Sequence, residues 1–295
     1  VSIIMKALKK FLIGLLIFLL VIILIVAGGY FFVKGKYGID LVEVIGHLKN
    51  LSTEVNKDEQ FTNQPKDEDM VSAKNKFNAE LTNFITYSDG KYDVSTDGVT
   101  SMHNDIVLNG KEVGAIVDNL FLSKIEDENG IKSMTLAGVK LNYELVQVEF
   151  VELNEKTVTF ETVLDLDVKG LKSSMTSFPL NLVSGFLPDH IFAASYIDVT
   201  KGESPNTYTV ASKSLAMNKC DGDSTKSLFD IIGKFVSGIS IETINNIIGK
   251  TVFDALVGPD DSNKGLVRNL GSLNASDFDF VKSGENINFV IKAGA

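Results

Sequence analysis

The sequence predicts an α+β protein: an N-terminal transmembrane helix, then a long, bent antiparallel sheet with amphipathic helices packed on its apolar face. Three observations lead to this fold class. An uncharged apolar run lies near the N-terminus, two long middle stretches alternate apolar and polar residues, and stretches with helical spacing flank them. The expected order along the chain is helices, long strands, helices and a last strand. This order indicates an α+β fold rather than a parallel α/β fold.

The apolar run extends from Phe11 to Val33 and contains no charged side chain. As a helix, its 23 residues reach about 34 Å, enough to cross a hydrocarbon core of about 30 Å. A cleavable signal peptide is the alternative, but the run exceeds the usual signal core and only a weak small-residue site ends it. Three lysines before the run favour a cytoplasmic N-terminus. We therefore expect residues 1–10 in the cytoplasm, a single-pass anchor over 11–33 in the cell membrane, and an extracytoplasmic remainder.

The composition narrows the class of function. A net charge of −10 argues against binding nucleic acid and against a basic patch for anionic lipids. Cys220 is the single cysteine, so no internal disulfide can form and packing must stabilise the fold. Arg268 is the single arginine among many lysines and asparagines. That bias is typical of AT-rich Gram-positive bacteria and their wall-less relatives.

A stalk helix and an acidic linker, together residues 34–70, are predicted after the anchor. Apolar residues from Leu41 to Val55 at three- and four-residue spacing predict the amphipathic stalk helix. It is expected either to pack on the domain or to lie near the lipid headgroups. Polar and acidic residues then predict a linker over 56–70. The extracytoplasmic domain is expected to occupy residues 71–295.

Two helices are predicted before the sheet. The second opens at Asn109–Glu112, and apolar residues at helical spacing follow from Val113 to Phe121. The first ends at a turn over Ser88–Gly90, and its apolar face is expected at Phe77, Leu81, Phe84 and Ile85.

Beyond Gly130 the spacing of apolar residues changes from helical to alternating. Alternation through Leu145 resumes one residue out of phase at Val146, which predicts a β-bulge that bends the strand. After a turn at Asn154–Lys156, the next strand places apolar residues on one face and mostly charged or hydroxyl residues on the other. The pair is predicted to form a long hairpin with one apolar face and one face in water.

The remaining elements are two strands, a turn, two helices and a last strand, in that order. The two strands are expected at 191–199 and around Tyr208 and Val210, and the turn at 220–225. The two helices are expected at 228–236 and 241–252, and the last strand at 287–291.

Four segments carry a family resemblance: the helix opening Leu108–Glu112, the long hairpin, the strand ending Lys213–Leu215 that runs into Leu228–Val236, and the closing strand Asp277–Ile291. In these segments, residues 106–292 resemble the YpmS-like family of Gram-positive single-pass membrane proteins and, more loosely, the lipid-handling TULIP and AsmA-type domains. The resemblance implies a domain that binds lipid or another apolar ligand outside the membrane. Segments 41–87 and 241–256 lie outside the family pattern.

The sequence carries no enzyme motif, so we predict no enzyme, no metal and no cofactor. His47, His103 and His190 lie far apart, and none has a second histidine or a cysteine at metal-ligand spacing. Asp165 and Asp167 are expected on the solvated face of their strand. We therefore expect these histidines and aspartates to be ordinary surface or hydrogen-bonded residues and not metal ligands or catalytic groups.

One acidic turn could bind calcium, because Asp221 and Asp223 are close in sequence. It lacks the glutamate that closes an EF-hand loop, so a helix cap by Asp223 or Ser224 is the favoured interpretation. The enzyme alternative is a divergent cell-wall hydrolase that uses Asp221 and Asp223 as its acids.

The apolar face of the second hairpin strand and the helix after the turn define the candidate ligand groove. Periodicity alone cannot separate a filled core from a groove for a membrane lipid. The sequence therefore predicts a domain that binds a lipid at the membrane surface. The alternative is an envelope scaffold whose strand edge or helix face binds another envelope protein. The candidate groove residues are Phe160, Leu164, Leu166, Val168, Phe229, Ile232 and Phe235.

Overall fold

The computed structural model describes residues 41–123, 131–136, 139–174, 188–233, 240–258 and 265–294. The architecture in these ranges is α+β, as predicted, and every strand pairing is antiparallel. No helix within the same ranges is long and apolar enough to cross a membrane. The predicted anchor over 11–33 lies outside the described residues.

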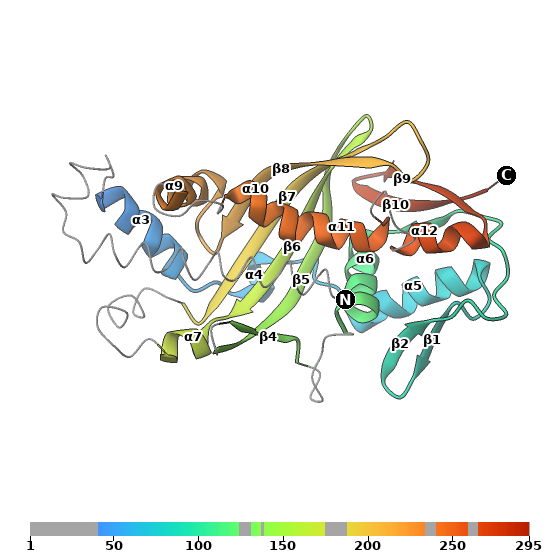
Figure 1. The fold of residues 1–295 in the computed structure, drawn as a ribbon, viewed down its shortest axis with the longest axis horizontal. Coiled ribbons are helices and arrows are strands. Elements are labelled where there is room, and N and C mark those ends of the chain that lie inside the picture. Colours follow the sequence, from blue (N-terminus) through green and yellow to red (C-terminus); the bar gives the residue numbers. More distant parts are fainter. Residues whose placement is uncertain are drawn as a thin grey trace.

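A five-stranded antiparallel sheet in the order β4-β5-β6-β7-β8 forms the centre of the molecule (Figure 1). Its strands follow one another along the chain, so each pairs with its neighbour in sequence. Four of them have 10 to 16 residues, longer than the usual 5 to 6. Their bounds are β4 Ser133–Leu136, β5 Val139–Asn154, β6 Thr157–Asp167, β7 His190–Lys201 and β8 Tyr208–Met217.

The predicted β-bulge is confirmed in β5. The pairing with β6 runs from Leu145 opposite Leu164 to Gln147 opposite Val163, which leaves Val146 as the extra residue. A bulge increases the local twist and bends the strand. It also moves Val146 to the outer face of the sheet, where it packs with Val163 and Phe192.

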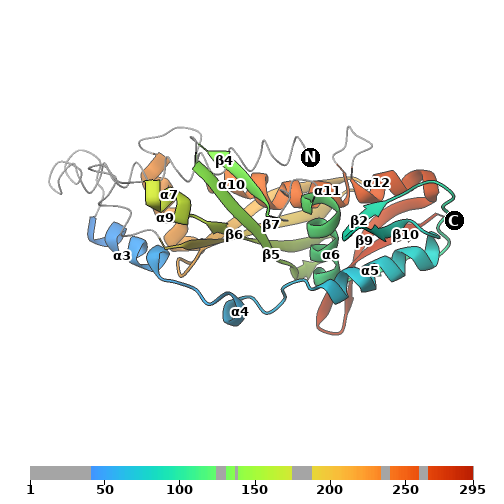
Figure 2. The ribbon, with the colours of Figure 1, turned by 90° about the horizontal axis from the view of Figure 1, so that it is seen from below.

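Helices cover the inner face of this sheet (Figures 1 and 2). The longest of these helices is continuous through α10, a π-helical segment and α11. At Gly249 this helix lies so close to β7 that an added Cβ would meet Ile197 Cγ2 at 2.9 Å, which requires glycine there. The helices are α3 Leu41–Ser52, α4 Lys57–Gln60, α5 Asp67–Glu80, α6 Gly110–Ile116, α7 Lys169–Ser174, α9 Gly222–Gly233, α10 Ile241–Asn245, α11 Thr251–Leu256 and α12 Leu266–Leu270; π-helical segments are Val117–Leu122 and Asn246–Lys250, and a 3-10 turn is Gly271–Leu273.

A second sheet, in the order β3-β10-β9, packs at the end of the first through a cluster of phenylalanines. Phe253 of α11 is fully buried at the centre of this cluster. Its ring centroid lies 5.7 Å from that of Phe160 in the first sheet and 6.0 Å from that of Phe278 in the second. The second-sheet strands are β3 Ile106–Leu108, β9 Ala275–Ser283 and β10 Asn286–Ala293.

The helix predicted up to Ile85 ends earlier than expected. Helix α5 stops at Glu80, and Ile85 begins a small hairpin of β1 (Ile85–Ser88) and β2 (Lys91–Val94). Asp89 and Gly90 at its turn have φ values of 52° and 77°, the left-handed pair that a tight two-residue hairpin requires.

The predicted wet face of β6 is wrong in its centre. Glu161 and Asp165 are 6% and 8% exposed, because the chain between α3 and α5 crosses this outer face as a strap (Figure 2). We call residues 53–66 the strap. Its Phe61 packs against Phe192 of β7, with the rings tilted and their centroids 5.3 Å apart, and shields the sheet from water.

The predicted stalk helix packs on the domain. Leu48 and Leu51 of α3 belong to the same buried core as Phe77 of α5 and the inner residues of the sheet. The hydrophobic core therefore does not divide at residue 70, and the predicted stalk and linker are built into the folded unit.

Candidate functional site

The candidate groove residues of the sheet lie in the buried core. Phe160, Leu166 and Val168 are 0% exposed and Leu164 is 5% exposed. None of the four lines the open groove described below. Their assignment to a ligand surface stays a prediction, and the structure places them in the main hydrophobic core.

The candidates of the following helix are placed differently. Phe229 of α9 is 3% exposed and lines that open groove. Ile232 lies in α9, but its side chain is outside the described part of the structure, as is the whole of Phe235. Phe229 is thus the predicted site residue that the structure brings to an accessible cavity.

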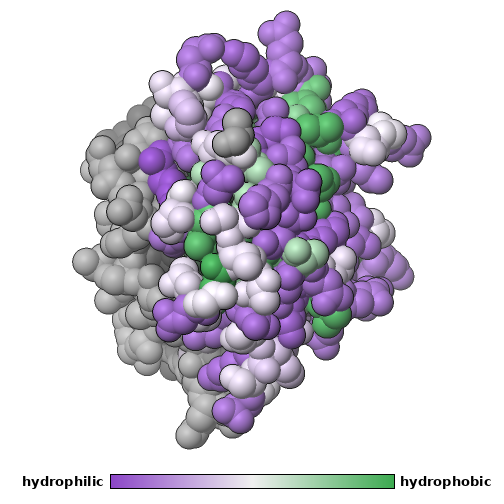
Figure 3. All heavy atoms as spheres, turned by 90° about the vertical axis from the view of Figure 1, so that its right-hand side faces the viewer, coloured by the Kyte–Doolittle hydropathy of each residue, from purple (hydrophilic) through white to green (hydrophobic). Residues whose placement is uncertain are grey.

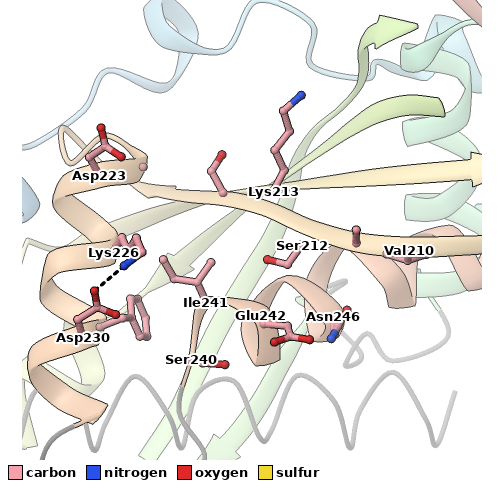
Figure 4. Close-up of a pocket in the computed structure, with 14 residues that line it drawn as sticks. Val210, Ser212, Lys213, Asp223, Lys226, Asp230, Ser240, Ile241, Glu242 and Asn246 are labelled. Atoms are coloured by element: carbon pink, nitrogen blue, oxygen red, sulfur yellow. Dashed lines mark hydrogen bonds and ion pairs between the residues drawn. The ribbon is translucent and has the colours of Figure 1, made fainter. Parts of the chain in front are cut away.

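The groove has a volume of about 840 Å³ and lies between edge strand β8 and helices α9 and α10 (Figure 4). We call it the β8–α9–α10 groove. Small-molecule sites have volumes of about 300–1,000 Å³, so the size suits a ligand. Its lining residues are Val210, Ala211, Ser212, Lys213, Ser214, Gly222, Asp223, Lys226, Phe229, Asp230, Ser240, Ile241, Glu242 and Asn246.

Local sequence signals build the two helical walls. Asp221 caps α9, because its Oδ1 accepts the backbone N–H of Ser224 at 2.8 Å, a bond that lowers the pKa of this carboxyl group. The predicted cap at Asp223 or Ser224 is therefore wrong by two or three residues. Gly222 then lets α9 approach β8, since an added Cβ would lie 3.2 Å from Ser214 Cβ. Ser240 caps α10 by accepting the N–H of Thr243 at 3.1 Å.

The groove combines apolar walls with charged residues. Val210, Phe229 and Ile241 contribute apolar side chains. Lys213 brings little positive charge into the groove. Its side chain points to the opposite side of β8 from Ile241 (Figure 4), where Lys213 Nζ donates to Thr159 Oγ1 at 2.8 Å. Lys226 pairs with Asp230 along α9 at 2.6 Å. The groove therefore suits an apolar chain better than a free anion.

Asn245 of α10 fixes the strand that forms one wall. It is fully buried, and its Nδ2 lies 2.8 Å from Ser212 Oγ and 2.9 Å from Ser214 O. Its Oδ1 accepts Ser195 Oγ–H at 2.9 Å. These residues surround a bulge at Lys213, where the β7–β8 register shifts by one. The amide therefore satisfies backbone and hydroxyl groups that the bulge leaves unpaired within the sheet.

A second polar cluster lies on the outer face, where Asp165 meets His190. Both carboxylate oxygens of Asp165 lie 3.0 Å from His190 Nδ1, and Lys169 Nζ lies 3.1 Å from His190 Nε2. An ammonium group can only donate, so Nε2 accepts from it and Nδ1 carries the proton toward Asp165. Burial raises the pKa of Asp165, and the bond from His190 opposes that rise.

This Asp–His pair resembles part of a catalytic relay but lacks a nucleophile. It lies between two clefts of about 300 and 370 Å³. Neither cleft is lined by a serine, threonine or cysteine among the described residues. Sequence reasoning did not find the pair, since its members come from strands β6 and β7 and meet only through the sheet register.

The buried carboxylate of Glu161 has no cationic partner among the contacts the structure gives it. It accepts Tyr196 Oη–H at 2.5 Å and Gln147 Nε2–H at 2.8 Å, and Gln147 Nε2 also lies 3.0 Å from Glu149. The strap closes the cluster, since Asn63 N–H donates to Gln147 Oε1 at 3.1 Å. Burial raises the pKa of Glu161 and the nearby Glu149 adds to the rise, although the two hydrogen bonds oppose it.

We expect Glu161→Gln to stabilise the protein at neutral pH and to flatten its pH dependence. Because the folded-state pKa of Glu161 is raised, folding takes up a proton, so this group favours folding at low pH and that contribution is lost as pH rises through the folded pKa. Urea unfolding at about pH 5 and about pH 7.5 measures the free energy of unfolding of both proteins and hence its pH dependence. The exposed Glu285→Gln is the matched control, and an unchanged pH dependence in Glu161→Gln would contradict the assignment.

The single cysteine, Cys220, is buried. Burial raises the pKa of Cys220 to about 11, and its Sγ–H donates to His47 O at 3.1 Å. No group of three or more histidine, cysteine, aspartate or glutamate side chains within these ranges is arranged to hold a metal ion.

Comparisons with protein-family models, curated proteins and solved structures find no match to this chain.

Proposed function

We propose that this protein is a membrane-anchored, extracytoplasmic domain that holds an apolar chain of a membrane lipid in the β8–α9–α10 groove. The observation that carries the proposal is the open groove of about 840 Å³ with Val210, Phe229 and Ile241 on its walls. Each buried CH₂ group contributes about 0.8 kcal/mol, so a partly buried acyl chain gains enough to offset its lost freedom. The charged residues beside the apolar walls suit the polar end of an amphiphile.

The proposed ligand site lies at the edge of the sheet and not on its apolar face, where the sequence predicted it. The ligand does not replace the core beneath α10 and α11, where Phe160 and Leu166 are fully buried. It lies instead against the edge of the sheet, where α9 and α10 meet β8. Such a position lets a lipid enter from the side without opening the core. We propose no enzymatic step.

We expect the full-length protein, purified from its host membrane in a mild detergent, to carry lipid, and Ile241→Asp to lower the lipid content at least about tenfold. An ionised carboxylate in the groove makes burial of an acyl chain unfavourable. The change should spare folding, because Ile241 is the first residue of α10 and a helix N-terminus favours an acidic side chain. Quantitative mass spectrometry of extracted lipid measures the effect.

Val71→Asp is the matched control, because Val71 is 46% exposed on α5, a helix that contributes no residue to the groove. Its lipid content should equal that of the unchanged protein. Equal lipid loss in both variants, or no loss in either, would contradict the groove assignment.

A scaffold function is the second candidate, and exposed valines on the second sheet favour it. Val107 and Val281 are 42% and 43% exposed and lie on the same face as Val290. Figure 3 views this end of the molecule and shows apolar areas separated by hydrophilic ones. If the purified protein carries no lipid, and a Val107→Lys, Val281→Lys variant loses a crosslinked envelope partner, the scaffold is the better account.

A further inference from the structure

Helix α3 is fastened to the domain at several points along its length. Leu48 and Leu51 are 3% and 1% exposed in the main core. The carbonyl groups of His47 and Leu51 accept hydrogen bonds from Cys220 Sγ at 3.1 Å and from Asn218 Nδ2 at 2.8 Å. Both donors lie between β8 and α9, so the orientation of α3 is coupled to the groove wall.

Helix α3 and the β8–α9–α10 groove lie at the same end of the molecule. In both ribbon views α3 lies at the opposite end from the second sheet and the C-terminus, with α9 beside it (Figures 1 and 2). Contacts between α3 and α9 confirm this neighbourhood. Since α9 forms a wall of the β8–α9–α10 groove, the groove and α3 share that end of the domain.

The chain length before α3 places this end near the predicted anchor. Eight residue steps separate Val33, the last residue of the uncharged run, from Leu41, the first of α3. Fully extended, they span at most about 29 Å. Ile45 is 51% exposed on α3, so the helix presents a large aliphatic side chain away from the core.

We infer that the α3 end of the domain is a membrane-contact surface, with Ile45 inserted among the lipid headgroups. An aliphatic side chain on a helix gains free energy at the boundary between headgroups and acyl chains. The inference rests on the predicted anchor and deepens the proposed function, because the fixed contact of α3 keeps the groove-bearing end toward the lipid. With a net charge of −10, the chain is expected to make this contact through apolar burial rather than through attraction to anionic lipid.

The absence of tryptophan from the sequence makes the inference directly testable. Ile45→Trp and the matched control Val281→Trp each introduce a single tryptophan at a similarly exposed position, the second on β9. The full-length variants are reconstituted into phosphatidylcholine vesicles with or without phosphatidylcholine brominated near the top of its acyl chains. We expect the brominated lipid to quench Ile45→Trp by about half and to leave Val281→Trp nearly unchanged.

Equal quenching of the two variants, or no quenching of Ile45→Trp, would overturn the contact surface. If Ile45→Trp fails to fold, Gly46→Trp replaces it, because Gly46 has open space where a Cβ would be. Vesicle flotation of the same samples checks the anchor, and protein that does not float overturns the inference as well. Lipid extracted from the purified protein distinguishes the two proposals: quenching without bound lipid removes only the groove, and bound lipid without quenching removes only the contact.

Discussion

Phe253→Ala is expected to lower the free energy of unfolding by about 3–5 kcal/mol, the range for a fully buried phenylalanine. The ring of Phe253 joins three parts of the fold. Its centroid lies 4.9 Å from that of Tyr208, 5.7 Å from that of Phe160 and 6.1 Å from that of Phe280. Truncation therefore removes buried apolar area and leaves a cavity where α11 and the two sheets meet.

Urea unfolding of the full-length protein in a mild detergent, followed by circular dichroism, measures this loss. Val71→Ala is the matched truncation, because Val71 is 46% exposed on α5 and surface changes usually stay within about 0.5 kcal/mol. A loss below about 1 kcal/mol in Phe253→Ala would show that the second sheet does not pack on the first through this ring.

Asn245→Ala is expected to destabilise the protein by roughly 3 kcal/mol, because it leaves several buried polar groups without a partner at about 1–3 kcal/mol each. Ser195 Oγ loses its acceptor, and Ser214 O loses its donor. Both groups lie at the β7–β8 bulge, so the edge strand of the groove should loosen. Hydrogen exchange at the β8 amides is expected to accelerate more than exchange in the second sheet.

Asn269→Ala is the control for Asn245→Ala, because it makes the same substitution at an exposed helical position. It should leave both the unfolding curve and the exchange of β8 unchanged. Uniform acceleration of exchange over the whole domain in Asn245→Ala would contradict a local role at the bulge.

The parts of the fold that could be predicted are those with strong local signals. The phase change at Val146 predicted the bulge, and the helix expected to open at Asn109 is present as α6, where Asn109 and Glu112 form a capping box. Those signals act within a few residues of chain, where backbone geometry is decided locally. Strand β6 followed from uninterrupted alternation in the same way.

The parts that were missed depend on distant residues. The strap covers Glu161 through contacts of Phe61 and Asn63, about 100 residues earlier in the chain, so alternation in β6 could not show that both its faces are buried. The three-residue strand β3 has no signal of its own and forms because β10 pairs with it. Asp89-Gly90 was a usable hairpin signal that the apolar spacing around Ile85 obscured.

Helical spacing predicted Phe229 on the apolar face of its helix, and the structure places it on a wall of the β8–α9–α10 groove. Its role in binding a ligand stays a prediction. The opposite wall at Val210 and the third at Ile241 come from separate elements, and their meeting depends on the path of the chain between them. A sequence pattern identifies an apolar face but not the gap between two such faces.

The central claim is that a lipid chain occupies the β8–α9–α10 groove, and the location of a crosslinked lipid tests it most directly. The full-length protein is reconstituted with a phospholipid that carries a photoactivatable group in its acyl chain, and the modified peptides are mapped by mass spectrometry. Besides modification expected over the predicted anchor, our account predicts adducts in segments 210–214, 222–230 and 240–246, which Ile241→Asp should abolish. Adducts confined to the anchor, or equal labelling of these segments in Ile241→Asp, would contradict it.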